Sequence, residues 1–177
     1  MCAGLAGTFS RTPKGRAGPP GAAPRFERGP CGAAKDRALV GGEHNIINPP
    51  ELGTASGYSN GILTEGGKLL FIAGQIAWDT EHRLIGPGDF VAQFEQALRN
   101  VLAVVSAAGG RPEHLTELTI FITDKRSYFE NAEEIGRRYR ALCGKHFPAM
   151  ALVVVKDLLE EGALVEIRGT AVLPQGA

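Results

Sequence analysis

Cysteine, methionine and histidine are all scarce in this chain of 177 residues, which holds three Cys, two Met and four His. Two of the cysteines, Cys2 and Cys31, lie among the first 43 residues, so the remainder has no partners for a disulfide framework. The histidines occur singly, and no CxxC or HExxH motif gathers metal ligands. The composition therefore predicts neither a disulfide-rich secreted domain nor a metal site.

Long apolar runs, phosphate-binding loops and basic patches are also missing. No apolar run approaches the roughly 20 residues that a membrane span needs, and no secretory signal follows Met1. No glycine-rich loop follows a strand in a nucleotide-binding pattern. Residues 44–177 hold twelve Lys/Arg and sixteen Asp/Glu, a net charge of −4, which disfavours nucleic acid as a partner. We expect a cytoplasmic protein with no membrane or nucleic-acid partner.

Residues 1–43 form an extension rich in Gly, Pro, Ala and Arg, with nine Gly, five Pro and a net charge of +4. With almost no large aliphatic residues it cannot bury enough apolar surface to offset the entropy of ordering, so we predict disorder. A weak organelle-targeting segment and a mis-assigned start, with the protein beginning near Leu39 or Val40, are alternatives. The folded domain is expected to occupy residues 44–177.

Periodicity in that domain predicts the order β-β-α-β-α-β-β, an α+β fold with its helices packed on one face of the sheet. Asp89 is expected to cap the first helix, and Ser127 with Glu130 forms a capping box that would open the second. Gly66-Gly67 is typical of a hairpin turn. The expected strands cover residues 58–64, 69–73, 115–123 and 151–155, with a last strand around Val165, Ile167 and Ala171.

The last expected strand contains an ionisable residue among aliphatic ones. Because side chains alternate along a strand, Glu166 and Arg168 share one face and Val165 and Ile167 the other. A buried carboxylate is costly unless it has a partner. Two interpretations stay open: a structural ion pair between Glu166 and Arg168, or a functional carboxylate.

Five short sequences together resemble the YjgF/YER057c/UK114 family, also called the Rid (reactive intermediate deaminase) family. They are AGQI (73–76), AAGG (107–110), LTIFITD (118–124), PAM (148–150) and VEIRGTAV (165–172). The resemblance implies a chorismate-mutase-like fold and a homotrimer that binds a small molecule in clefts between subunits. It also implies hydrolysis of 2-imino acids, or their enamine tautomers, to 2-keto acids and ammonia without a cofactor.

The same resemblance implies which residues form the site. Glu166 matches a glutamate that positions or activates the attacking water. Tyr58 matches a tyrosine near the cleft, where it would assist catalysis or, alternatively, pack in the core or an interface. Gly74 matches a glycine whose missing side chain lets backbone line the pocket, and Ala149 lies in the family's Pro-Ala-Arg-Ser/Thr motif.

Two positions depart from the family pattern. Met150 stands where the family has an arginine that holds the substrate carboxylate, and methionine offers neither charge nor donor. Met150 would line an apolar pocket or simply fill the core. Arg168 replaces a second glutamate and is either a displaced anion clamp or an ion-pair partner.

Two functions follow from this pattern. The first is a Rid-type hydrolase of a small imine, enamine or related amine, for which the missing arginine argues against the usual 2-imino-acid activity. The second is a non-catalytic trimeric protein that binds a small metabolite in the same cleft. An RNA-cleaving role is disfavoured by the net charge of −4.

Overall fold

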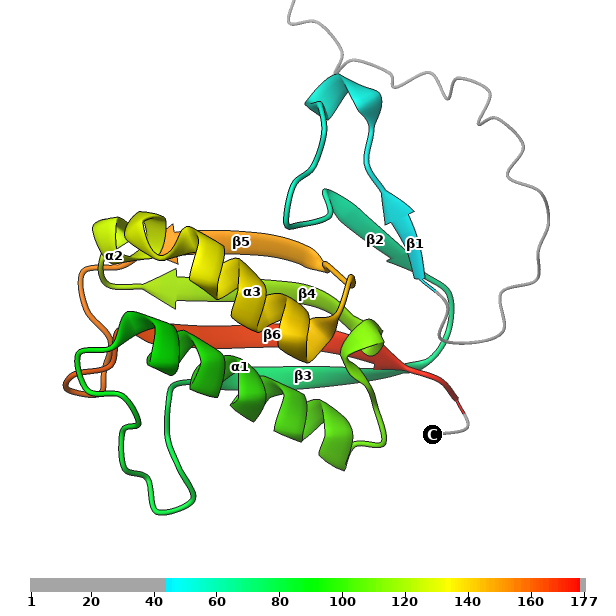
Figure 1. Cartoon of the computed structure of the whole chain (residues 1–177). Helices are drawn as coiled ribbons and strands as arrows, with labels where there is room; N and C mark the ends of the chain where they lie inside the picture. The colour runs from blue at the N-terminus through cyan, green and yellow to red at the C-terminus, as the bar shows by residue number, and fades with distance from the viewer. Residues whose placement is uncertain (1–43, 176–177) are drawn as a thin grey trace, which may run out of the picture. The chain divides into compact units, whose positions relative to one another are not determined.

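The computed structural model of the chain describes residues 44–175, so the predictions for residues 1–43 lie outside the described part (Figure 1). Within it, the α+β class is confirmed. The elements are β1 (His44–Ile47), β2 (Gly61–Thr64), β3 (Lys68–Gln75), α1 (Phe90–Ala107), β4 (Leu115–Ile122), α2 (Lys125–Glu130), α3 (Ala132–Cys143), β5 (Ala149–Val154) and β6 (Val165–Leu173), with short 3-10 turns at Pro50–Leu52 and Pro112–His114.

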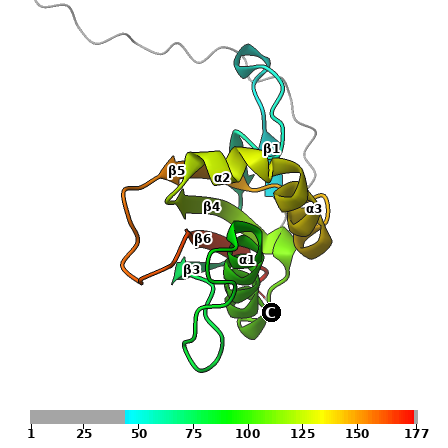
Figure 2. The same ribbon diagram turned by 60° about the vertical axis from the view of Figure 1, so that its left-hand side comes forward.

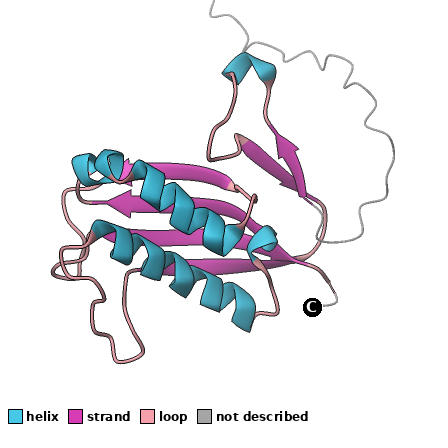
Figure 3. Cartoon of the chain, in the orientation of Figure 1, coloured by secondary structure: helices cyan, strands magenta, loops and turns pink. Residues whose placement is uncertain are grey.

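The main sheet has four strands in the order β3-β6-β4-β5, coloured magenta in Figure 3. Strands β4 and β5 run parallel, whereas β6 is antiparallel to both of its neighbours. Strands β1 and β2 pair with each other in a separate two-stranded ribbon. Helices α1 and α3 lie on the same face of the main sheet, as predicted (Figure 2). Among the described residues, no helix is long and apolar enough to cross a membrane.

The core forms between that face and the two helices. Along β6 the side chains of Val165 and Ile167 are fully buried, while Arg168 is exposed on the other face, as the alternation predicts. Asp89 caps α1 through its carboxylate, which accepts a hydrogen bond from the Ala92 N–H at 3.0 Å. The fully buried residues of α1 and the sheet that meet there are Leu98, Val101, Val105, Leu115, Leu118, Ile122, Val165 and Ile167.

Strand β5 is an edge strand and is unusually apolar for one. Leu152, Val153 and Val154 are 39%, 40% and 49% exposed, respectively. On its open side only the start of the strand is covered, where Ser59 forms an isolated bridge with Ala149. Most of this edge therefore presents unpaired backbone groups flanked by aliphatic side chains.

Two details at the start of the domain differ from prediction. Strand β1 was not anticipated, because its four residues are too few for a clear periodic pattern and lie just before the Pro49-Pro50 pair. Gly66 and Gly67 do form a turn with φ of 68° and 93°, but the strands on either side do not pair with each other. The hairpin prediction was wrong because β6 supplies the partner of β3, from about 100 residues later in the chain.

The predicted capping box at Ser127 was also wrong. Asp124 is the cap, since its carboxylate accepts hydrogen bonds from the backbone N–H groups of Arg126 and Ser127 at 2.9 and 3.0 Å. Its second oxygen also accepts from the Ser127 hydroxyl at 2.6 Å. A nearby carboxylate outcompetes serine for the free N–H groups of the first turn. The helix then breaks at Asn131 into α2 and α3.

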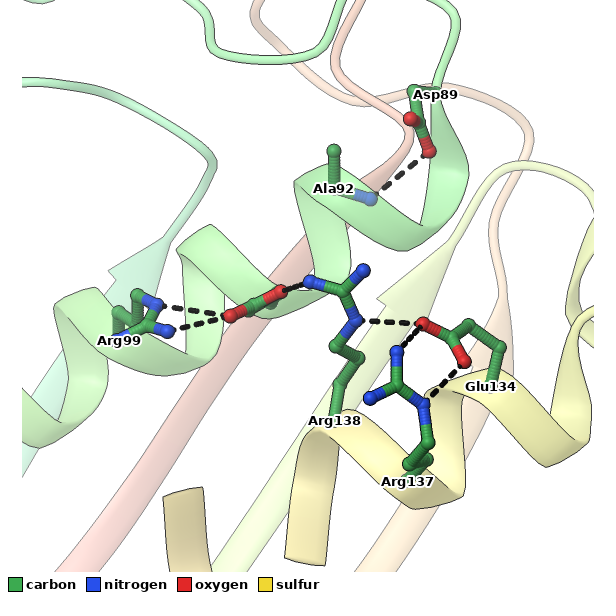
Figure 4. Close-up of polar contacts among 7 residues, drawn as sticks. Asp89, Ala92, Arg99, Glu134, Arg137 and Arg138 are labelled. Atoms are coloured by element: carbon green, nitrogen blue, oxygen red, sulfur yellow. Dashed lines mark hydrogen bonds and ion pairs between the residues drawn. The ribbon is translucent and has the colours of Figure 1, made fainter. Parts of the chain in front are cut away.

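A chain of ion pairs joins α1 to α3 across their exposed surfaces (Figure 4). Arg138 contacts both Glu95 of α1 and Glu134 of its own helix, the latter at 2.7 Å. Arg137 also pairs with Glu134, and Arg99 pairs with Glu95 at 2.6 Å. Hydrogen bonds from Arg137 first, and then from Arg138, lower the pKa of Glu134 from 4.5 to about 2.

A pH-dependent loss of stability is expected from this network. Because the folded-state pKa of Glu134 is lowered, its stabilising effect is fully present above about 4.5 and is lost as pH falls towards 2. The variant Glu134→Gln should therefore be less stable than wild type at pH 7, with the difference vanishing on acidification and shrinking in high salt. Urea unfolding at several pH values measures this. Glu133→Gln removes the same charge from the same turn and is the control; an equal pH-dependent loss in both variants would contradict the prediction.

Candidate functional site

Glu166 lies directly against the backbone of Gly74 at the β3 edge of the sheet. Gly74 belongs to an irregularity in β3, where the register with β6 shifts between Ile72 and Gln75. A Cβ atom on Gly74 would lie only 1.7 Å from Oε1 of Glu166, so the carboxylate occupies the space that a side chain would need. The structure thus brings together two residues, 92 positions apart in the sequence, that the sequence assigned to one site.

The carboxylate of Glu166 makes no hydrogen bond or ion pair with any other described residue. In particular, no ion pair forms with Arg168, which lies on the same face opposite Thr119 of β4. The exposed Arg168 does not line the hollow at Glu166. A partly buried carboxylate without a partner is available to water or to a ligand.

The hollow at Glu166 has a volume of about 440 Å³. It contains two carboxylates, Glu160 and Glu166, and no Lys or Arg among its lining residues. Five segments converge on it: the end of β3, the loop that follows β3, α1, the loop that precedes β6, and β6 itself. The lining residues are Gly74, Gln75, Ile76, Trp78, His82, Asn100, Leu159, Glu160 and Glu166.

The loop after β3 supplies an aromatic wall. The rings of Trp78 and His82 stack with their centroids 4.9 Å apart and their planes 20° from parallel. His82 holds a left-handed backbone conformation with φ of 58°, which is uncommon outside glycine. Asp79 maintains the turn, because its carboxylate accepts backbone hydrogen bonds from Glu81 and Arg83 at 2.8 and 2.9 Å. The hydrogen bond from Arg83 is the main reason that the pKa of Asp79 is lowered.

Asn100 of α1 fixes the position of this wall. Its side-chain amide donates to the carbonyl oxygens of Ile76 and Trp78 at 2.9 and 3.0 Å. Gln96 donates in turn to Oδ1 of Asn100 at 2.9 Å. The indole N–H of Trp78 is buried and has no acceptor among the described residues, which costs about 1–3 kcal/mol unless a ligand or partner supplies one. A second hollow of about 480 Å³ adjoins the same residues, with Asp79 on its wall.

Sequence reasoning missed the aromatic wall and its anchor. No site residue was predicted in the polar segment of residues 77–89, although Trp78, the one tryptophan of the chain, lies within it. An isolated aromatic residue in a polar loop is a usable signal for a site. Asn100 gives no such signal, because its partners are backbone carbonyls more than 20 residues away.

Met150 lies on the opposite face of the sheet from Glu166. It is in register with the fully buried Leu118, whereas Glu166 is in register with Phe121, three residues along the same strand. Met150 packs against the core and lines an apolar cavity of about 180 Å³ below Tyr139 of α3. Within one chain Met150 thus packs in the core and does not share a hollow with Glu166, so its role in lining a ligand pocket stays a prediction.

Tyr58 and Ala149 also lie away from the Glu166 hollow. Tyr58 is 41% exposed and precedes Ser59, whose N–H donates to the Pro148 carbonyl at 3.0 Å. Ala149 follows that proline on the face opposite to Met150. Of the six residues named from the sequence, the structure groups Glu166 with Gly74 and places Tyr58, Ala149 and Met150 together near the start of β5.

No group of three or more His, Cys, Asp or Glu side chains that could hold a metal ion occurs between residues 44 and 175. The only cysteine in that range, Cys143, is free and buried, and burial raises the pKa of its thiol to about 11. It is therefore a packed core residue rather than a nucleophile.

Comparison with known proteins identifies the class that this fold and site define. Residues 49–173 match the family model described as Endoribonuclease L-PSP, and the chain belongs to this family, which is the YjgF/Rid family. The resemblance stated from the sequence is thereby confirmed.

Several relatives show how far the likeness extends. Protein DfrA of Myxococcus xanthus is 36% identical over 115 residues, which cover 65% of this chain and 84% of the relative. The RutC family protein y4sK of Sinorhizobium fredii is 33% identical over 65% of this chain and 86% of its own length. The solved structure of the Rid-family protein YyfB from Yersinia pestis superposes with a TM-score of 0.66 at 29% identity, covering 73% of this chain and 98% of YyfB.

Proposed function

We propose that the protein is a hydrolase of small imines, enamines or related amines, with Glu166 as the group that activates water. The observation that carries this proposal is the unpartnered carboxylate of Glu166, held against Gly74 in a hollow of about 440 Å³. A carboxylate in this position accepts a proton from water that attacks the carbon of a C=N bond. Transfer of that proton to nitrogen completes the tetrahedral carbinolamine. Its hydroxyl proton then passes to nitrogen through the same carboxylate, and the C–N bond breaks to give a carbonyl compound and free amine or ammonia.

We expect the substrate to differ from a 2-imino acid, because no Lys or Arg among the described residues of one chain lines the hollow to hold its carboxylate. Met150 stands at the position of the family's arginine and packs against the core, and the hollow at Glu166 has no Lys or Arg on its wall. We expect the rate of ammonia release from an imine without a carboxylate, such as benzophenone imine, to exceed the rate from freshly generated 2-iminopropanoate by about tenfold or more. The reason is that a carboxylate without a cation to pair with loses the energy of a charge-assisted hydrogen bond. Equal or faster turnover of 2-iminopropanoate would contradict this substrate assignment.

A non-catalytic binding protein is the second candidate, and the missing arginine is the observation that favours it. Assays of ammonia release and of ligand-induced thermal stabilisation separate the two. A binding protein would be stabilised by small imine analogues and release no ammonia above the uncatalysed rate, and that combination would refute the hydrolase.

We also propose that the chain assembles as a homotrimer. Leu69 and Phe71 of β3 are 63% and 74% exposed on the sheet face that the helices leave uncovered, and the apolar edge strand β5 is open. Large exposed apolar surfaces of this kind mark contact sites between proteins. A neighbouring subunit placed there would bring further residues towards Glu166.

Light scattering after gel filtration tests the assembly. We expect a mass three times the 18.7 kDa of one chain, and a shift to the single-chain mass for Phe71→Lys, since a buried unpaired ammonium is costly. Phe129→Lys is the matched control, because Phe129 is also exposed, at 64%, but lies on α2. A wild-type mass of one chain would contradict the trimer.

A further inference from the structure

We infer that the hollow at Glu166 selects a planar cation, such as a protonated aromatic imine or an amidinium, rather than an anionic imino acid. The hydrolysis of such a cation rests on the proposed function, whereas the binding of a planar cation does not and is measurable without turnover. Charge, shape and chemistry each lead to it independently.

The ionisable side chains that line the hollow are two carboxylates and His82. Glu166 contributes one carboxylate from β6, and Glu160 a second from the loop before it. The adjoining hollow adds Asp79, whose lowered pKa keeps it ionised at neutral pH. The nearest loop cation, Arg83, pairs with Asp79 and Glu81 at 2.8 Å and does not line either hollow. Because Asp79 is paired with Arg83, the free carboxylates are Glu160 and Glu166. An anion entering here would meet repulsion from these two groups, whereas a cation would be attracted by them.

The shape of the wall suits a flat ligand. The stacked rings of Trp78 and His82 are held nearly parallel, and both side chains line the two adjoining hollows. The face of an indole ring attracts cations through its quadrupole, and tryptophan is the strongest such partner among side chains. The left-handed backbone at His82 is a strained conformation that the turn around Asp79 maintains, and strain of this kind concentrates at functional sites.

The chemistry of hydrolysis favours the same charge. Protonation of an imine nitrogen makes the carbon more electrophilic and leaves the group planar and positive. Glu160 is placed to pair with that positive nitrogen while Glu166 handles the attacking water, so the two carboxylates take different roles. Leu159, which is fully exposed at the rim, offers an apolar contact for the aromatic part of such a ligand. We therefore assign Glu160, Trp78 and His82 as determinants of specificity.

Trp78 makes the test direct, because it is the only tryptophan of the chain and its fluorescence reports on the two adjoining hollows that it lines. The wild-type protein is titrated with benzamidinium, with its neutral isostere benzamide, and with the planar anion benzoate. We expect saturable quenching by benzamidinium at a Kd at least about tenfold below that of benzamide, and no saturable response to benzoate. A Kd for benzoate equal to or below that for benzamidinium would overturn the inference.

Variants assign the effect to the named residues. Glu160→Gln is expected to raise the Kd of benzamidinium by about fivefold to tenfold while leaving that of benzamide unchanged. Glu161→Gln is the matched control, because Glu161 is the next residue, exposed, and outside the lining of the hollow. Equal effects of the two variants would show a general charge effect and overturn the role of Glu160. His82→Ala should weaken both benzamidinium and benzamide, since it removes half of the aromatic wall.

The two proposals fail in distinguishable ways. Benzamidinium binding without hydrolysis of any imine would support the cation site and refute the hydrolase. Hydrolysis of imines without saturable quenching by benzamidinium would support the hydrolase and refute the cation site.

Discussion

Replacement of Glu166 with glutamine is expected to lower kcat by about 100-fold or more, because general acid–base catalysis by a positioned carboxylate contributes on the order of 10²–10⁴. Glutamine keeps the size of the side chain and loses the basic oxygen, so the fold and the position against Gly74 should persist. The KM should change much less than kcat. Ammonia release from the preferred imine, with the melting temperature measured in parallel, checks both expectations.

Two further variants show whether the loss of kcat depends on the position of the Glu166 carboxylate or on negative charge at this sheet face in general. In Gly74→Ala the added Cβ would lie 1.7 Å from Oε1 of Glu166, so the carboxylate must move and a similar loss of kcat is expected. Glu117→Gln is the control, since Glu117 is a carboxylate on the same sheet face that does not line the hollow. Activity retained in Glu166→Gln would refute the catalytic assignment, and activity lost in Glu117→Gln would refute its specificity.

Replacement of Gln93 with leucine is expected to reduce the free energy of unfolding by about 3 kcal/mol or more. The side chain of Gln93 is fully buried and makes three hydrogen bonds to backbone. Its amide donates to the carbonyls of Gly86 and Gly162 at 3.1 and 3.0 Å, and its oxygen accepts from the Leu164 N–H at 2.8 Å. Leucine would remove the partner of the Leu164 N–H and of the Gly162 carbonyl, at about 1–3 kcal/mol for each group kept from water. The Gly86 carbonyl still accepts a hydrogen bond from the Asp89 N–H at 2.9 Å.

Urea unfolding of Gln93→Leu beside Gln96→Leu measures this effect. Gln96 lies one turn further along α1 and is not fully buried, so its replacement should cost less than about 1 kcal/mol. Similar losses in the two variants would show that helix propensity, rather than the buried hydrogen bonds, explains the change. Because Gln93 fastens both loops that border the hollow, Gln93→Leu should also weaken benzamidinium binding.

Local patterns predicted much of the fold but only part of the site. The alternation of β6 and the Asp89 cap depend on neighbours in sequence, and both were read correctly. The Asp124 cap was missed because two suitable caps lie within four residues, and only the geometry decides between them. The hairpin at Gly66-Gly67 failed because the partner of β3 comes from the far end of the chain.

The site required contacts that no short pattern encodes. Glu166 and Gly74 were linked from the sequence only through the family resemblance, and the structure shows the physical reason in the space that glycine leaves. The placement of Met150 on the other sheet face depends on the parallel register between β4 and β5, which sequence periodicity does not fix. Trp78, His82 and Asn100 meet through a loop whose path is set by side-chain hydrogen bonds to backbone.

The open edge of β5 affects how much of a newly synthesised or refolding chain reaches the native state. Among the described residues, this edge of β5 is covered only where Ser59 bridges Ala149. An extended segment of another chain can therefore pair with the rest of this apolar strand. If the proposed trimer covers that edge, its assembly and irreversible aggregation compete for the same surface, and dilution slows both. The yield of native protein on refolding should therefore depend on the concentration of chains and on strand-blocking peptides, even though each chain folds its own core.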